Sequence, residues 1–180
     1  MTSIGTLYLN DVRTLFLRYR DLAERAMRQI SDDAFFHIVE ADGNSIAIIV
    51  KHIAGNIRSR WTDMLTSDGE KPDRNRDAEF EIDADTTREQ LMEIWDRSWG
   101  ILFATLDSLK ADHLTQTIRI RNEPHTVLEA INRQLTHYAN HVGQIITLAR
   151  QAQGADWESL SIPRGQSDAF NATMQTRHGM

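Results

Sequence analysis

The sequence predicts an all-α protein: a four-helix bundle with a long crossover connection and a short extended arm before the last helix. Apolar residues recur at alternating steps of three and four in four long segments, the spacing of one helix face. The 180 residues include only three prolines and nine glycines, which are few for a strand-rich protein with many tight turns. Amphipathic helices bury such stripes most simply against one another.

The first two helices are predicted from their apolar stripes. The first stripe runs from Tyr8 to Ile30, and the helix ends near the acidic turn at residues 31–33. The turn at residues 42–45 offers two candidate N-caps. A second helix follows, with its stripe from Ile46 to Trp61.

A polar stretch of about twenty residues, long for a loop inside a compact domain, precedes the third helix. Residues 67–77 offer nothing to bury, so this is either a loop that shapes a binding site or a flexible insertion. Its length suits a crossover between parallel helices. A capping box at Thr86 and Glu89 then begins the third helix, whose buried face runs from Leu91 to Leu109 and contains the helix-weakening Gly100.

The alternation of side chains over residues 115–121 predicts the extended arm. A second capping box, at Thr126 and Glu129, opens the last helix, which Gly154 ends. We therefore expect one bundle domain over residues 1–155 and a C-terminal tail over residues 156–180 that packs on it or extends from it.

Composition restricts the function. With 41% hydrophobic and 26% charged residues the chain is of the globular type. A net charge of −6 argues against a nucleic-acid partner. Because there is no cysteine, a metal site would have to use nitrogen and oxygen ligands. The first residues carry neither a basic segment nor an apolar run, so we expect no signal peptide, no membrane span and a cytoplasmic location.

Three of the seven histidines are candidate metal ligands. His137 and His141 lie four apart in the last helix, so both rings project from one face. His52 lies beside the apolar stripe of the second helix and should point into the bundle or its rim. Further polar residues accompany the histidines on both helices: Asn56, Ser59 and Asp63 on the second helix, and Gln134 and Gln144 on the last. The alternative is that His52 is a core residue whose hydrogen bonds are made within the protein, and that His137 and His141 lie on a solvent-exposed helix face.

Other candidate sites are weaker. Trp61, Trp95 and Trp99 have the spacing of core residues. The pairs Arg58 with Arg60 and Arg74 with Arg76 are interleaved with acids and are expected to be solvated surface, with a phosphate or carboxylate clamp as the alternative. No serine has the surroundings of a nucleophile, and no HExxH motif supplies a glutamate base.

Four stretches of the sequence, residues 52–63, 68–77, 137–145 and 160–165, resemble the DinB/YfiT-like superfamily of metal-dependent bundle proteins. The resemblance is strongest to a branch catalogued as a domain of unknown function, and it extends over nearly the whole chain. It implies a four-helix bundle with a crossover and a divalent metal held by His52, His137 and His141.

The resemblance and the three imidazoles together suggest an enzyme. Zinc, nickel or iron at such a site lowers the pKa of a bound water or thiol, so we expect a hydrolase or a thiol-dependent transferase that acts on a small electrophilic substrate. Asn56, Gln144, Arg60 and Asp63 are candidates to orient ligands or substrate. The alternative is a non-catalytic bundle that works as a homodimer through apolar side chains on the first and third helices, namely Phe16, Leu17, Ile101 and Phe103.

Overall fold

The computed structural model describes residues 2–178 and is mostly helical, which confirms the predicted class. Its body consists of four long helices: α1 (Ile4–Met27), α3 (Ile46–Trp61), α4 (Arg88–Ser108) and α5 (Val127–Gln153). Helix α3 has 16 residues and covers the same span as its predicted apolar stripe, from Ile46 to Trp61.

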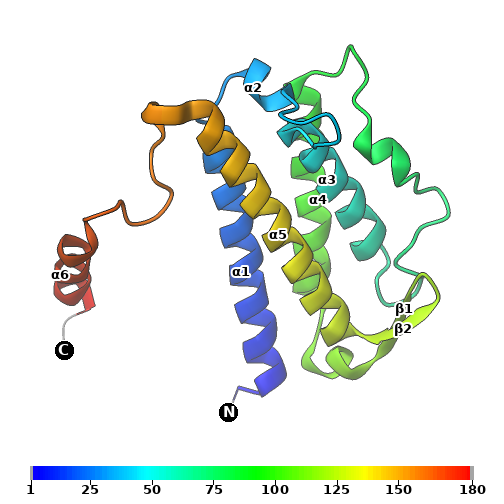
Figure 1. Cartoon of the computed structure of the whole chain (residues 1–180). Coiled ribbons are helices and arrows are strands. Elements are labelled where there is room, and N and C mark those ends of the chain that lie inside the picture. The colour runs from blue at the N-terminus through cyan, green and yellow to red at the C-terminus, as the bar shows by residue number, and fades with distance from the viewer. Residues whose placement is uncertain (1, 179–180) are drawn as a thin grey trace.

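The long helices pack as α1 against α5, α3 against α4, and α3 against α5. In Figure 1, α1 and α5 run in one direction, while α3 and α4 run in the other. The connection between α3 and α4, residues 62–87, therefore returns along the length of these helices. It contains the 3-10 helix η1 (Asp77–Phe80), which packs on α3.

Side-chain caps define where the helices begin. Ser45 caps α3, and the capping box of Thr126 with Glu129 opens α5 as predicted. The box of α4 is formed by Thr87 and Gln90, one residue later than expected. The sequence contains two overlapping boxes at this point, because both adjacent threonines have an acidic or amide residue three positions later.

Each long helix contributes at least one fully buried aromatic ring to the core: Phe16, Trp61, Trp99 and Tyr138, with Trp95 of α4 buried beside Trp99. The centroid of Phe16 lies 5.5 Å from Trp61, 5.9 Å from Tyr138 and 6.3 Å from Trp99. The expected core role of the tryptophans is thus confirmed. The suggestion that Phe16 is free for a subunit interface is wrong, although its neighbour Leu17 is 42% exposed.

The predicted arm is the first strand of an antiparallel hairpin, β1 (Thr117–Ile120) with β2 (Glu123–Thr126), in which Ile118 lies opposite His125. The turn residues Arg121 and Asn122 both have positive φ, as the tightest hairpin turns require. Their backbone N–H groups donate to the two carboxylate oxygens of Asp68, each at 2.8 Å. The α3–α4 connection is therefore fastened to the hairpin.

The remaining elements are short. Helix α2 (Asp32–Phe36), which the sequence pattern missed, precedes α3; η2 (Ala111–Thr115) precedes the hairpin, and η3 (Gly154–Asp156) follows α5. Helix α6 (Ser167–His178) stands apart from the four long helices in Figure 1. Within residues 2–178, no helix combines the length and the apolar character needed to cross a membrane.

Candidate metal centre

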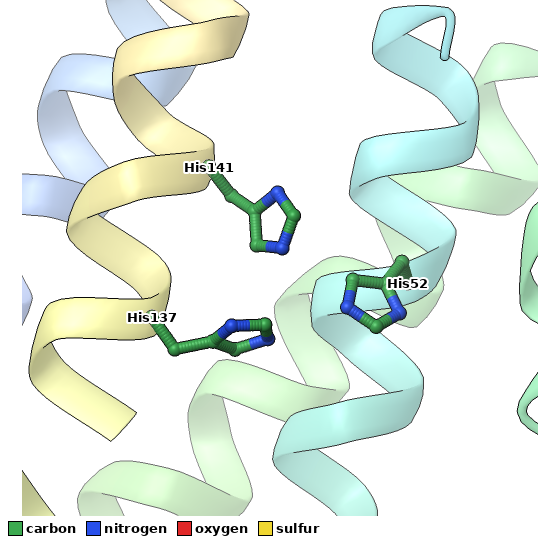
Figure 2. A group of neighbouring side chains, drawn as sticks. All are labelled: His52, His137 and His141. Atoms are coloured by element: carbon green, nitrogen blue, oxygen red, sulfur yellow. The ribbon is translucent and has the colours of Figure 1, made fainter. Parts of the chain in front are cut away.

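Three histidines from two helices converge between α3 and α5. His137 and His141 occupy successive turns of α5, and His52 lies in the middle of α3; Figure 2 shows the three rings pointing toward one another. Their ring centroids are 4.6 to 5.3 Å apart. One ligand atom from each lies within 4.8 Å of the others, which makes the group a candidate metal centre.

The hydrogen bonds of these rings suit a metal ligand set. Nδ1 of His52 donates to Oε2 of Glu79 at 2.8 Å, and Nδ1 of His141 donates to Oε1 of Gln144 at 2.8 Å. Nε2 of both rings is thereby left as a lone-pair donor. Nε2 of His137 is buried and has no hydrogen-bond partner among the described residues, an arrangement that is costly unless something binds there.

The spacing of the rings is slightly wider than a bound ion requires. Nitrogen ligands about 2.0–2.1 Å from a tetrahedral zinc lie about 3.3 Å apart, compared with an upper spacing of 4.8 Å here. Small side-chain rotations would close this gap. The residues present therefore fit a divalent metal held by three neutral imidazoles.

Glu79, in η1, is a part of the site that the sequence interpretation missed. Its carboxylate accepts the hydrogen bond from His52 and two more from Arg74, at 2.7 Å and 2.9 Å. Burial raises the pKa of Glu79, but the bonds from His52 and Arg74 outweigh this and hold it below its usual value. The carboxylate therefore stays ionised and fixes the ring of His52.

The expectation that the polar connection offers nothing to bury is wrong. Glu79 is 7% exposed, and the side chain of Arg74 is 5% exposed. Arg60 is buried too, so the expected solvated character of the arginine pairs holds only for the exposed Arg58 and Arg76. Opposite charges from one short stretch pair with each other, and this pairing permits their burial.

The surroundings keep two of the candidate ligands neutral. Burial, aided by the neighbouring His141 and His52, lowers the pKa of His137 to about 3. Burial also lowers the pKa of His141, although its hydrogen bond to Gln144 opposes this. Because a metal binds the unprotonated imidazole, protons compete weakly for these two ligands at neutral pH.

A pH-dependent loss of stability follows from His137. Its pKa is depressed in the folded protein, so the unfolded chain binds the proton more readily, and stability falls as the pH drops below about 6.5 toward 3. In metal-free protein we expect the free energy of unfolding to fall by about 1 to 2 kcal/mol between pH 7.5 and pH 5. Urea unfolding in the presence of a chelator measures this change. In the His137→Gln variant the free energy of unfolding should depend less on pH. An unchanged pH dependence would show that His137 is not its cause.

The four predicted accessory residues have different surroundings. Gln144 contacts His141, and Asn56 accepts a hydrogen bond from the Tyr138 hydroxyl at 2.9 Å beside His52. Arg60 donates to the backbone carbonyl of Gly69 and to Glu70. Asp63 is exposed, has a positive φ just after α3, and contacts none of the three histidines through a hydrogen bond or ion pair. The structure thus brings Gln144, Asn56 and Arg60 toward the centre and leaves Asp63 outside it.

Two cavities flank the histidines. A cavity of about 190 Å³ is lined by His52 and His137 together with Asn56, Gln134 and five arginines. A wider hollow of about 720 Å³ lies between α5 and the segment before α3, and Gln144 lines it. The smaller cavity is the one that two of the histidines reach directly.

The fold and this site define a mostly helical protein with three convergent histidines that could hold a metal ion. Residues 3–166 match the profile of a family described as "Protein of unknown function (DUF1572)". The match covers most of the chain, so the protein belongs to this family. No curated protein and no solved structure is significantly similar to the chain. The matched range contains the three histidines and Glu79.

Proposed function

We propose that the protein is a metal-dependent enzyme of the DinB/YfiT-like superfamily in which His52, His137 and His141 hold one divalent ion. The observation that carries the proposal is the convergence of three imidazoles from two helices, with ligand atoms within 4.8 Å of one another. Zinc, nickel and iron all suit such ligands. The four long helices with the returning connection would then be the crossover bundle of that superfamily.

A divalent ion held there would lower the pKa of a coordinated water or low-molecular-weight thiol and so supply a nucleophile near neutral pH. The chain's own residues orient the ligands: Glu79 fixes the ring of His52, and Gln144 fixes that of His141. Three protein ligands leave room for a further one, which is typical of catalytic and not of structural sites.

The adjoining cavity supports a catalytic role for the ion. A volume of about 190 Å³ is below that of a pocket for a drug-sized molecule and suits a small substrate. The reaction class that fits is attack by water or a thiol on a small electrophile, as in a hydrolase or a thiol-dependent transferase. The buried chain of hydrogen bonds from Trp61 through Tyr138 to Asn56 would hold the cavity wall in place.

Metal analysis tests the proposal. Full-length protein purified without a nickel column should contain close to one divalent ion per chain by mass spectrometry. His52→Ala, His137→Ala and His141→Ala should each lose most of it, whereas His37→Ala, at an exposed position, should retain it. If the triple variant held as much metal as the wild type, the proposed site would be wrong.

A further inference from the structure

We infer that the cavity beside the three histidines is an anion-binding site, which would make the substrate a small organic anion with a phosphate or carboxylate group. Every charged side chain that lines it, apart from the two histidines, is an arginine: Arg60, Arg74, Arg76, Arg121 and Arg133. This is unusual on a chain with a net charge of −6. Guanidinium groups bind phosphate and carboxylate through paired hydrogen bonds.

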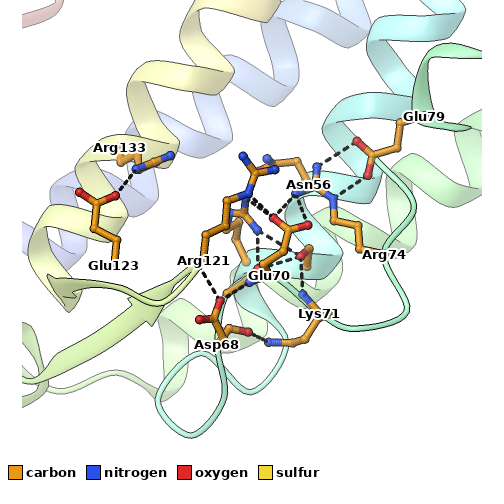
Figure 3. A network of polar contacts seen from close by, with 12 residues as sticks. Asn56, Asp68, Glu70, Lys71, Arg74, Glu79, Arg121, Glu123 and Arg133 are labelled. Carbon is orange, nitrogen blue, oxygen red and sulfur yellow. Dashed lines mark hydrogen bonds and ion pairs between the residues drawn. The ribbon is translucent and has the colours of Figure 1, made fainter. Parts of the chain in front are cut away.

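The carboxylates near the arginines neutralise only part of this charge. Figure 3 shows the network around Glu70, which accepts from Arg60 at 3.0 Å, from Arg121 at 2.9 Å and from Arg74 at 3.3 Å. Of the five cavity arginines, Glu79 forms an ion pair only with Arg74. Five guanidinium groups thus face only two carboxylates that are largely buried, because the other two acids paired with them, Glu123 and Asp77, are largely exposed.

The outer arginines are the ones left available for a ligand. Arg133 approaches its nearest carboxylate, that of Glu123, only to 3.9 Å, and Arg76 approaches Asp77 only to 3.9 Å. Both acids are largely exposed, and such pairs contribute little. Arg121 is held at the cavity by the hairpin turn that Asp68 fastens. An anion entering the cavity would therefore meet Arg76 and Arg133, which have no close carboxylate partner, beside Arg121, which shares Glu70 with Arg60 and Arg74.

An unpartnered amide in the same cavity also points to a ligand. Gln134 is 3% exposed and lines the cavity one turn before His137, and its Oε1 has no hydrogen-bond partner among the described residues. A buried acceptor of this kind calls for a donor. A phosphate monoanion or a hydroxy acid carries an O–H donor as well as the negative charge, so either would satisfy Gln134 and the arginines together.

The role of the anion as substrate depends on the proposed function, whereas its binding does not. Because His52 and His137 line the same cavity as the arginines, a bound anion would lie next to the proposed metal. Calorimetric titration of full-length protein with inorganic phosphate and, separately, with glycolate tests binding without any assumption about activity. The two titrations also show whether phosphate or carboxylate is preferred.

We expect at least one of the two anions to bind with a stoichiometry of one. Arg121→Gln and Arg133→Gln should each weaken its affinity about tenfold or more, the value of a charge-assisted hydrogen bond. These side chains are about half exposed, so the fold should tolerate the changes. Arg18→Gln, at an exposed position on α1, should have no effect. Failure of both anions to bind, or unchanged affinity in the two cavity variants, would overturn the inference.

The triple histidine variant separates this inference from the proposed function. If this variant has lost its metal but still binds the anion, the arginines bind the anion independently of the metal. If the wild type binds no metal but does bind the anion, the proposed enzyme fails and the anion site stands. If it binds metal but neither anion, the metal site stands and the substrate class is wrong.

Discussion

The Glu79→Gln variant is expected to bind zinc about 10- to 100-fold more weakly than the wild type. The carboxylate accepts the Nδ1 hydrogen bond of His52 at 2.8 Å, and a carboxylate in this position orients the ring and makes the opposite nitrogen more basic. Glutamine keeps the size of the side chain but loses the negative charge. Competition against a chromophoric chelator measures the affinity.

Two further variants separate the effect on the metal from the effect on folding. Glu79→Ala leaves Arg74, with a side chain that is 5% exposed, without its main partner, and breaking a buried pair in this way costs about 3 to 5 kcal/mol. Urea unfolding in the presence of a chelator should show this loss. Glu81→Gln alters an exposed acid two residues away and should change neither quantity. Equal zinc affinity in Glu79→Gln and the wild type would show that Glu79 plays no part in metal binding.

The histidine cluster could be anticipated from the sequence because helical geometry is local. A spacing of four residues on α5 fixes the relation of His137 to His141, and the apolar stripe of α3 fixes which way His52 faces. The long helices and the hairpin strand were predicted for the same reason. The approach of α3 to α5 is not local, and for that the sequence interpretation needed a family resemblance.

Glu79 could not be found in the same way. It lies 27 residues from His52, in a connection without periodicity, and is one of 26 acidic residues. Because Glu79 and Arg74 pair with each other, both charged side chains are buried, whereas charged residues in a polar stretch are ordinarily expected to be exposed. One signal was available: Gly55 lies inside α3 one turn after His52, and a glycine inside a helix often marks a place where another group approaches closely.

The connection between α3 and α4 thus gives the site its charge as well as its shape. It contributes Glu79 to the histidines and Arg74 and Arg76 to the cavity, and through Asp68 it positions Arg121 of the hairpin. A loop that looks like a flexible insertion in sequence is held by ion pairs at several points. Metal binding and anion binding should therefore respond together to changes in this segment.

The Gly55→Ala variant is expected to be less stable than the wild type by about 1 to 3 kcal/mol, the usual cost of overpacking a filled site. Alanine normally stabilises a helix relative to glycine by about 1 kcal/mol. Here an added Cβ would lie 2.5 Å from Oε1 and 2.8 Å from Cδ of Glu79, so the buried carboxylate would have to leave its place. Urea unfolding measures the stability, and chelator competition should show weaker zinc binding in the same variant.

Gly100→Ala is the matched control, because an added Cβ at this position in α4 meets nothing within 4 Å. It should raise the free energy of unfolding by about 0.5 to 1 kcal/mol, so the two substitutions should have opposite signs. The cause can be isolated by combining Gly55→Ala with Glu79→Ala, since the second change removes the atoms that the first one meets. The double variant should then be more stable than the sum of the single effects predicts. Strict additivity would mean that the cost at Gly55 arises elsewhere and that Glu79 does not rest against this turn of α3.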